Sequence, residues 1–150
     1  MNASKKDVLF VLIQFILFAV YLFEIPWLRL DFPGDAGWVN LIPAGIGIVI
    51  IIIAIFQLKK NLTAFPTPLE NSELIVTGLF LYVRHPIYSG ILMFTFFTAI
   101  YLNSGYKLII TVLLTILFYY KSEYEEAQLQ NKFPGYQSYK AGTGRFYPRF

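Results

Sequence analysis

The chain has 150 residues, of which 57% are hydrophobic and only 14% are charged. A water-soluble domain carries about 25% charged residues, so this composition excludes an ordinary soluble protein and predicts an integral membrane protein. The sequence has no cysteine for a disulfide or a thiolate site, and its single histidine argues against a protein-only zinc site. Its net charge of +3 is too small for a nucleic-acid-binding face, so we expect neither a metal nor a nucleic acid as partner.

Four apolar runs predict an all-α membrane bundle of about four transmembrane helices in one domain, residues 1–150. The first run has no signal-peptide cleavage site after it and is predicted to be retained. A span needs about 20 residues, so the third and fourth runs are short, and we expect them to form a closely packed hairpin with a turn at residues 103–106. The runs are residues 8–23, 39–58, 87–102 and 108–120.

The connections between these runs are predicted to be irregular. Residues 29–40 carry several glycines, prolines and aspartates and are flanked by Trp27 and Trp38, as interfacial rings flank a membrane loop. In the second run, Gly45 and Gly47 are small enough to let a neighbouring helix approach closely. The polar residues 61–78 contain two prolines, which favour an extended segment without a helix.

Lysine and arginine are unevenly distributed around the four runs. With four passes, Arg29 and Lys107 fall on one side of the membrane and ten basic residues fall on the other. Because basic residues favour the cytoplasmic side, we expect both termini and the segment around Arg84 to lie in the cytoplasm. The ten are Lys5, Lys6, Lys59, Lys60, Arg84, Lys121, Lys132, Lys140, Arg145 and Arg149.

The third apolar run directly follows Arg84, His85 and Pro86. Ionisable side chains are costly beside hydrocarbon, so an arginine and the single histidine at this position indicate a function. Proline suits the first turn of a helix and pushes the residue before it into an extended conformation, so we predict that a helix begins at Pro86. The N–H groups of residues 87–89 would then be free and, beside Arg84, would form an anion site. The alternative is that Arg84 contacts only lipid phosphates.

Residues 121–132 are predicted to continue the fourth run as a helix with water on one side. Ser122, Glu126, Leu129 and Phe133 fall on one stripe of this helix, so the carboxylate of Glu126 shares a face with apolar side chains. Such a carboxylate needs a cationic partner, and Arg84 is the candidate.

The neighbouring carboxylates are predicted to differ from Glu126. Glu125 lies about 100° around the helix and is placed to pair with Lys121, and Glu123 is turned toward water. Residues 135–150 form a tail without clear periodicity, which we expect to fold back over the segment around Arg84.

Four tyrosines surround this polar segment in the sequence. Their rings could hold a cationic ligand group, although interfacial anchoring is the alternative for each of them. They are Tyr82, Tyr88, Tyr136 and Tyr139.

Two groups of residues, joined by the predicted hairpin, carry a resemblance to the isoprenylcysteine carboxyl methyltransferase and phospholipid methyltransferase superfamily. The resemblance covers residues 61–150, and the run 133–135 departs from it by the insertion of Pro134. The first group is G-x-x-x-x-x-R-H-P-x-Y-x-G, with Gly78, Arg84, His85, Pro86, Tyr88 and Gly90. The second comprises Glu125, Glu126, Leu129, Phe133, Gly135, Tyr136 and Tyr139, followed by Arg145, Phe146 and Pro148.

This resemblance implies a membrane methyltransferase that uses S-adenosyl-L-methionine, with residues 61–150 as catalytic core and residues 1–60 as two N-terminal spans. The cofactor would lie between the hairpin and the C-terminal segment, and a lipophilic or lipid-linked acceptor would arrive from the bilayer. The chemistry of these side chains beside such a site leads us to expect Arg84 and Glu126 in catalysis. The resemblance implies that the cofactor is bound by His85, Pro86, Tyr88, Gly90, Gly78, Glu125, Tyr136 and Tyr139.

Three functions remain open at this stage. The first is O-methylation of a carboxylate that Arg84 orients, as in the isoprenylcysteine enzymes. The second is N-methylation of a phospholipid amine, which must lose a proton, with Glu126 placed to take it. The third is a non-catalytic four-helix membrane protein that binds anionic lipid.

Overall fold

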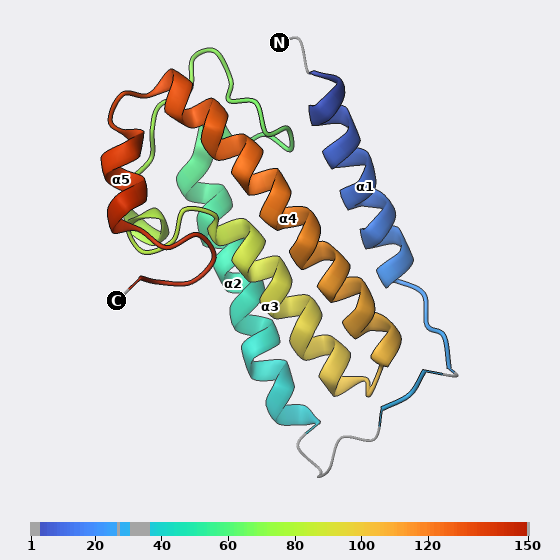
Figure 1. The fold of residues 1–150 in the computed structure, drawn as a ribbon. Coiled ribbons are helices and arrows are strands. Elements are labelled where there is room, and N and C mark those ends of the chain that lie inside the picture. Colours follow the sequence, from blue (N-terminus) through green and yellow to red (C-terminus); the bar gives the residue numbers. More distant parts are fainter. Residues whose placement is uncertain (1–3, 27, 31–36, 150) are drawn as a thin grey trace.

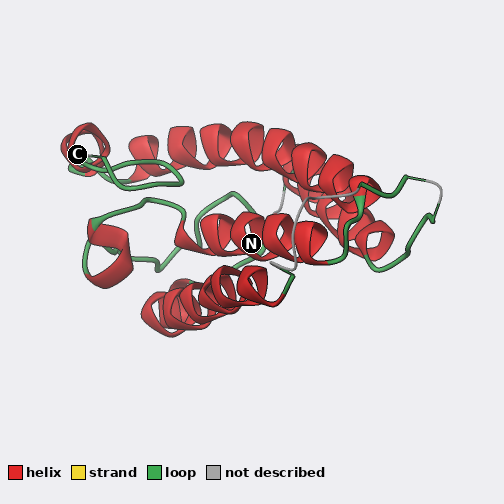
Figure 2. Ribbon diagram, turned by 90° about the horizontal axis from the view of Figure 1, so that it is seen from below, coloured by secondary structure: helices red, strands yellow, loops and turns green. Residues whose placement is uncertain are grey.

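The computed structural model describes residues 4–26, 28–30 and 37–149 (Figure 1). Over these residues the fold is all-helical, without a strand, as predicted (Figure 2). Three short 3-10 segments, η1 (Trp38–Asn40), η2 (Lys59–Asn61) and η3 (Gly78–Leu81), accompany the helices. The α-helices are α1 (Lys5–Tyr21), α2 (Leu41–Leu58), α3 (Pro86–Tyr101), α4 (Gly105–Lys132) and α5 (Tyr136–Gly142).

The four long helices lie side by side, with α1 packed against α4 and α2 packed against α3 (Figure 1). The predicted hairpin is present, since α3 and α4 are in contact and are joined by a turn in which Asn103 takes a positive φ of 50°. Ser104 caps α4 by accepting the N–H of Lys107, so this helix begins at Gly105, three residues earlier than the apolar run predicted. Trp27 and residues 31–36, on which part of the predicted loop falls, lie outside the described residues.

The contact between α2 and α3 rests on two glycines. A Cβ added at Gly47 would lie 2.7 Å from the carbonyl oxygen of Gly90, and one added at Gly90 would lie 2.6 Å from the carbonyl oxygen of Gly47. This contact confirms the close approach predicted for Gly47. Gly45 has no neighbour of this kind and faces open space, so its part of that prediction is wrong.

Replacing Gly90 by alanine should therefore lower the free energy of unfolding by about 1–3 kcal/mol, the usual cost of overpacking a close contact. Gly45→Ala is the matched control, because it adds the same methyl group where there is room and alanine favours the helix. Thermal unfolding of both variants in detergent checks this. Equal melting temperatures would contradict the contact.

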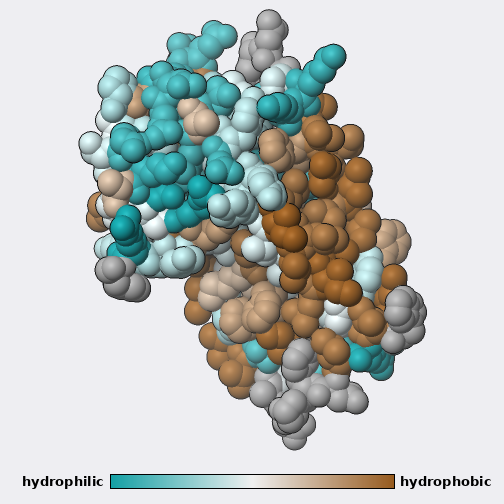
Figure 3. All heavy atoms as spheres, in the orientation of Figure 1, coloured by the Kyte–Doolittle hydropathy of each residue, from teal (hydrophilic) through white to brown (hydrophobic). Residues whose placement is uncertain are grey.

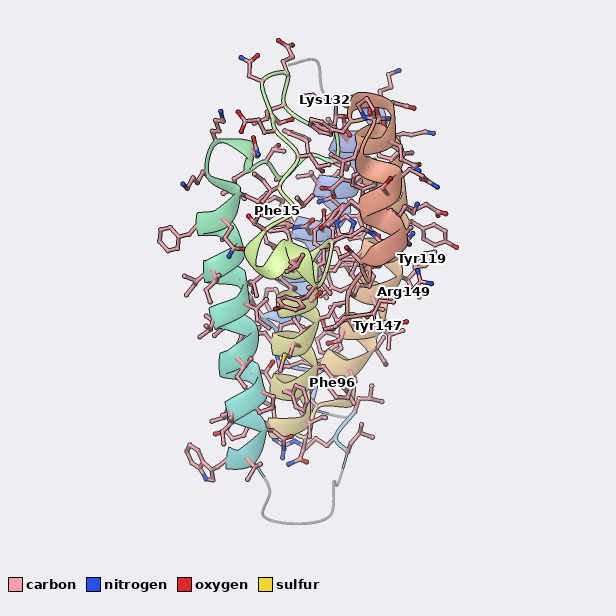
Figure 4. The ribbon with its side chains drawn as sticks, turned by 90° about the vertical axis from the view of Figure 1, so that its left-hand side faces the viewer. Phe15, Phe96, Tyr119, Lys132, Tyr147 and Arg149 are labelled. Atoms are coloured by element: carbon pink, nitrogen blue, oxygen red, sulfur yellow. The ribbon has the colours of Figure 1, made fainter. Side chains whose placement is uncertain are left out.

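Polar residues gather at one end of the molecule, around the end of α4, α5 and the segment 61–78, while the rest of this face is mainly apolar (Figure 3). Lys132 lies at this polar end and Phe96 lies further along the bundle (Figure 4). The 28 residues of α4 extend about 42 Å, longer than the roughly 30 Å hydrocarbon core. The predicted continuation of the fourth apolar run as one helix is confirmed.

Only one helical stretch of the described residues, Trp38–Asn61, is long and apolar enough to cross a membrane by itself. The helix α3 is apolar but shorter, with 16 residues. The count of four spans therefore stays a prediction.

The tail differs from its prediction, because residues Tyr136–Gly142 form the helix α5. Seven residues make about two turns, which is too short for an apolar period to show in the sequence. The chain leaves α4 at Phe133, which is extended, as the residue before a proline favours.

Candidate functional site

The segment before α3 pairs with the C-terminal tail. Val83 and Gly144 form a parallel bridge. The N–H of Arg84 donates to the carbonyl of Gly144 at 2.9 Å, and the N–H of His85 donates to the carbonyl of Arg145 at 3.1 Å. The tail thus folds back over the Arg84–His85–Pro86 segment, as expected from the sequence.

The helix α3 begins at Pro86, as predicted, but the expected extended conformation of His85 is not found, since its φ of −125° and ψ of 63° lie outside the extended region. The expected free N–H groups are only partly present, because the N–H of Ser89 donates to the carbonyl of His85 at 3.1 Å. Among the described residues, no hydrogen-bond acceptor is found for the backbone N–H of Ile87 or Tyr88. Two backbone donors therefore remain at the start of this helix.

Glu126 is the centre of a buried charge cluster, and its side chain is fully buried. One of its oxygens, Oε1, lies 2.8 Å from Nε of Arg84, 3.2 Å from Nε2 of His85 and 3.5 Å from Nε of Arg145. The other oxygen, Oε2, lies 2.9 Å from Nζ of Lys140 but makes no well-aligned hydrogen bond, so this contact acts mainly through charge. The predicted pairing of Glu126 with Arg84 is confirmed.

The charges around Glu126 set its ionisation. Burial alone would raise its pKa, but the contacts with His85, Lys140 and Arg84 outweigh burial and hold the pKa of this carboxyl well below its ordinary value of 4.5. Glu126 is therefore ionised throughout the physiological range and is a weak base. Its position suits it to hold cations in place.

Arg84 links this cluster to the tail. Its Nη1 donates to the carbonyl of Lys140 at 3.2 Å and also to the carbonyl of Thr143. Arg145, from the other side of the tail, lies with its guanidinium 4.7 Å from the ring centre of Tyr119. Arg84 thus donates hydrogen bonds both to the buried carboxylate of Glu126 and to backbone carbonyls at the end of α5.

A cavity of about 400 Å³ lies beside the start of α3. Its walls are mainly apolar and come from α1, α2, α3, α4 and the segment 62–64. The polar side chains that line it are Gln14, Thr63, His85, Tyr88, Lys121 and Glu125. Neither Arg84 nor Glu126 lines it, because both are engaged behind His85.

Glu125 is the carboxylate of this cavity. Its side chain is 28% exposed, its Oε2 accepts the hydroxyl proton of Tyr88 at 3.0 Å, and the same oxygen lies 3.7 Å from Nδ1 of His85. The helical phase predicted for α4 is confirmed, since Glu126 is buried, Glu125 is half-buried and Glu123 is exposed. The predicted pairing of Glu125 with Lys121 differs, because the Lys121 ammonium hydrogen-bonds to Gln14 and to the carbonyl of Ala64 instead.

Tyr88 is fixed between two rings. It stacks on His85 with ring centres 5.4 Å apart and on Phe118 with ring centres 4.5 Å apart. The Lys121 ammonium lies 5.5 Å from the centre of the same ring, so the cation near Tyr88 in this structure comes from the protein itself, where the sequence suggested a ligand cation.

Gly78 and Gly90 are expected cofactor residues that lie away from the cavity lining. Gly78 takes a positive φ of 62°, and a Cβ there would meet the side chain of Gln57, which accepts the N–H of Leu79 at 3.0 Å. Gly90 faces Gly47 at the helix contact described above. Backbone geometry therefore accounts for the glycine at position 78, and close packing accounts for the glycine at position 90.

Tyr136 and Tyr139 line a second cavity of about 90 Å³, which Glu125 also borders. The hydroxyl of Tyr139 donates to the carbonyl of Phe80 at 2.5 Å, and burial raises the pKa of Tyr139 to about 12. Burial also raises the pKa of Tyr136, whose hydroxyl has no hydrogen-bond partner among the described residues. These two tyrosines attach α5 to the rest of the site.

Sequence reasoning did not assign site roles to three basic residues. All three were used for membrane orientation, Lys121 also as the expected partner of Glu125 and Arg145 as part of the tail motif. In the structure Lys121 lines the cavity, and Lys140 and Arg145 contact Glu126. For Lys121, its position four residues before Glu125, on the same face of α4, was a usable signal. For the tail residues no local signal existed.

The profile of one protein family, described as phospholipid methyltransferase, matches residues 37–135. The match begins before α2, covers the α3–α4 hairpin with Arg84 and both carboxylates, and ends at Gly135. No curated protein matches the chain in a direct sequence comparison.

Proposed function

Because this chain belongs to the phospholipid methyltransferase family, a group of membrane methyltransferases, we propose that it uses S-adenosylmethionine to methylate an amine on a lipid or lipid-linked acceptor. The observation that carries this proposal is the position of Glu125. It is a half-buried carboxylate on the wall of a mainly apolar cavity, beside Tyr88 and His85.

The groups around the cavity fit this cofactor chemically. The unpaired N–H groups of Ile87 and Tyr88 at the start of α3 suit a carboxylate. The charge of Glu125 suits a sulfonium, and the apolar walls suit an adenine ring. When bound, the cofactor supplies an electrophilic methyl group, and the enzyme's main task is to align the acceptor with it.

An amine acceptor fits the cavity better than a carboxylate acceptor. A protonated amine must lose a proton before it attacks, and Glu125 is the carboxylate within reach of the cavity. Arg84, the residue expected to orient a carboxylate acceptor, is instead bound to Glu126 and to tail carbonyls. Glu125 would also repel a carboxylate. We therefore assign the base to Glu125 and give Arg84 and Glu126 positioning roles.

Carboxyl O-methylation is the second candidate, because Lys121 places one cation on the cavity wall. A single assay separates the candidates. Purified protein is given S-adenosylmethionine with a labelled methyl group, together with either phosphatidylethanolamine or a prenylated cysteine. We expect alkali-stable label in the phospholipid, as an N-methyl group requires. Alkali-labile label in the prenylcysteine would identify an ester and overturn the amine assignment.

We further propose that the chain crosses the membrane four times, with both termini and the site in the cytoplasm, and that residues 1–150 act as one domain with residues 61–150 as its catalytic core. The ten-to-two distribution of basic residues supports the orientation. The polar end in Figure 3 supports it as well, since it includes the segment around α5.

Cysteine labelling tests this topology directly, because the sequence has no native cysteine. Lys5→Cys and Ser138→Cys, both at exposed positions, should react with an impermeant maleimide only after the membrane is opened. Leu102→Cys, at the other end of the α3–α4 hairpin, should react in intact cells. Reaction of Lys5→Cys or Ser138→Cys from outside would show that the orientation is wrong.

A further inference from the structure

Lys121 is a buried cation that no carboxylate of the described residues contacts directly, although the charges of Glu125 and Asp7 act on it from a longer distance. Only 1% of the residue is exposed, although it stands one position after the last apolar run. Its Nζ donates to Oε1 of Gln14 at 2.6 Å and to the carbonyl of Ala64 at 3.0 Å, both neutral acceptors. No carboxylate of the described residues forms an ion pair with it. An ammonium group has three N–H donors, so one remains for a ligand.

The other buried lysine of α4 shows what a purely structural lysine looks like in this fold. Lys107 donates to the carbonyls of Tyr21 at 2.6 Å and Phe23 at 3.1 Å, and its Nζ lies 3.4 Å from Oε2 of Glu24. Its charge is therefore compensated within the protein. Lys121 forms no such ion pair among the described residues, is influenced only by the more distant charges of Glu125 and Asp7, and lines the cavity.

Lys121 and Glu125 are one helical turn apart on α4 and line the same cavity. Four residues correspond to a rise of about 6 Å, so the wall presents a positive group and a negative group at this spacing. In an ethanolamine phosphodiester, two carbons separate a negative phosphate from the amine. The cavity wall is complementary in charge to that headgroup, with Lys121 facing the phosphate and Glu125 facing the amine.

We propose that Lys121 binds the phosphate of a zwitterionic phospholipid acceptor and thereby places the acceptor's amine at Glu125. This inference rests on the proposed amine methylation and adds the residue that selects a phosphate-bearing acceptor. Lys121 lies where the apolar run of α4 ends, which is the depth of lipid phosphates in a membrane. The phosphate compensates the buried ammonium, whose desolvation is otherwise costly.

The test compares two acceptors, phosphatidylethanolamine and a long-chain alkylamine without phosphate, with wild-type protein, Lys121→Met and Lys107→Met. We expect Lys121→Met to raise KM for the phospholipid roughly ten- to a hundredfold, the usual effect of losing a hydrogen bond between charged groups. KM for the alkylamine and Kd for S-adenosylmethionine should stay within a few-fold. Lys121→Arg should recover most of the phospholipid KM, and Lys107→Met should affect both acceptors alike.

Inhibition of the wild-type protein tests the same phosphate-binding role without a variant. An alkyl phosphate should compete with the phospholipid and not with S-adenosylmethionine. Competition with S-adenosylmethionine, or a raised Kd for it in Lys121→Met with an unchanged phospholipid KM, would assign Lys121 to the cofactor's carboxylate and overturn this inference alone. Equal use of both acceptors by the wild type and Lys121→Met would overturn it too. Transfer to neither amine would overturn the proposed function with it.

Discussion

Replacing Glu126 by glutamine is expected to lower the free energy of unfolding by about 3–5 kcal/mol and to abolish methyl transfer. The substitution keeps the size of the side chain and removes the one negative charge that Arg84, Lys140 and Arg145 share. Those cations would then repel one another in a buried position, and the tail would lose the charge that holds Lys140 and Arg145 beside the start of α3. Thermal unfolding in detergent, together with the methyl-transfer rate, checks this result.

The loss of stability should depend on pH in a defined direction. The folded-state pKa of Glu126 is below its ordinary value of 4.5, so its stabilising contribution is fully present above the ordinary value. That contribution is lost as the pH falls below 4.5 and through the folded-state pKa. The difference in stability between wild type and Glu126→Gln should therefore be largest near neutral pH and should shrink in acid.

Two companion variants separate this account from a general effect of charge. Glu123→Gln removes an exposed carboxylate from the same helix and should change neither stability nor turnover. Arg84→Ala removes the link between Glu126 and the tail carbonyls and should resemble Glu126→Gln. If Arg84→Ala retained activity within a few-fold of wild type, Arg84 would be a lipid anchor and not part of the site.

Glu125→Gln is expected to lower kcat/KM by about 10²- to 10⁴-fold with little change in stability. Glutamine preserves an acceptor for the hydroxyl of Tyr88 but cannot take a proton from the attacking amine. Because Glu125 is 28% exposed and bears no buried ion pair with arginine, the fold should tolerate the change. Single-turnover methyl transfer measures the loss.

Glu125 and Glu126 are adjacent, so their variants form a matched pair. Glu125→Gln should give a stable, inactive protein that still binds S-adenosylmethionine, with Kd raised less than tenfold. Glu126→Gln should give an unstable one. A stable Glu126→Gln protein with the larger loss of turnover would return the base to Glu126 and contradict the assignment made from the cavity.

The parts of the fold that depend on local sequence were predictable. Proline chemistry placed the start of α3 at Pro86, and helical periodicity placed Glu126 inward and Glu123 outward. The pairing of Glu126 with Arg84 followed because a buried carboxylate needs a cation. Each of these inferences uses residues within a few turns of one another, or a single charge requirement.

The parts that depend on distant contacts were not predictable. The tail pairs with residues 83–85 through backbone groups, which any sequence can supply, so Lys140 and Arg145 gave no sign of their contact with Glu126. The resemblance placed Gly90 at the cofactor, and its contact with Gly47, 43 positions earlier in the chain, had no signal in the local sequence. Likewise, Lys121 turns inward because Gln14 and Ala64 receive its ammonium.

We propose that the cavity at the start of α3 is the site where an amine lipid is methylated. The most direct test is mass spectrometry of phosphatidylethanolamine after incubation with S-adenosylmethionine and purified wild-type protein, with Glu125→Gln in parallel. We predict that the wild type adds one or more methyl groups to the headgroup nitrogen and that Glu125→Gln adds almost none. Unchanged phospholipid in the wild-type reaction, or equal methylation by the variant, would contradict the claim.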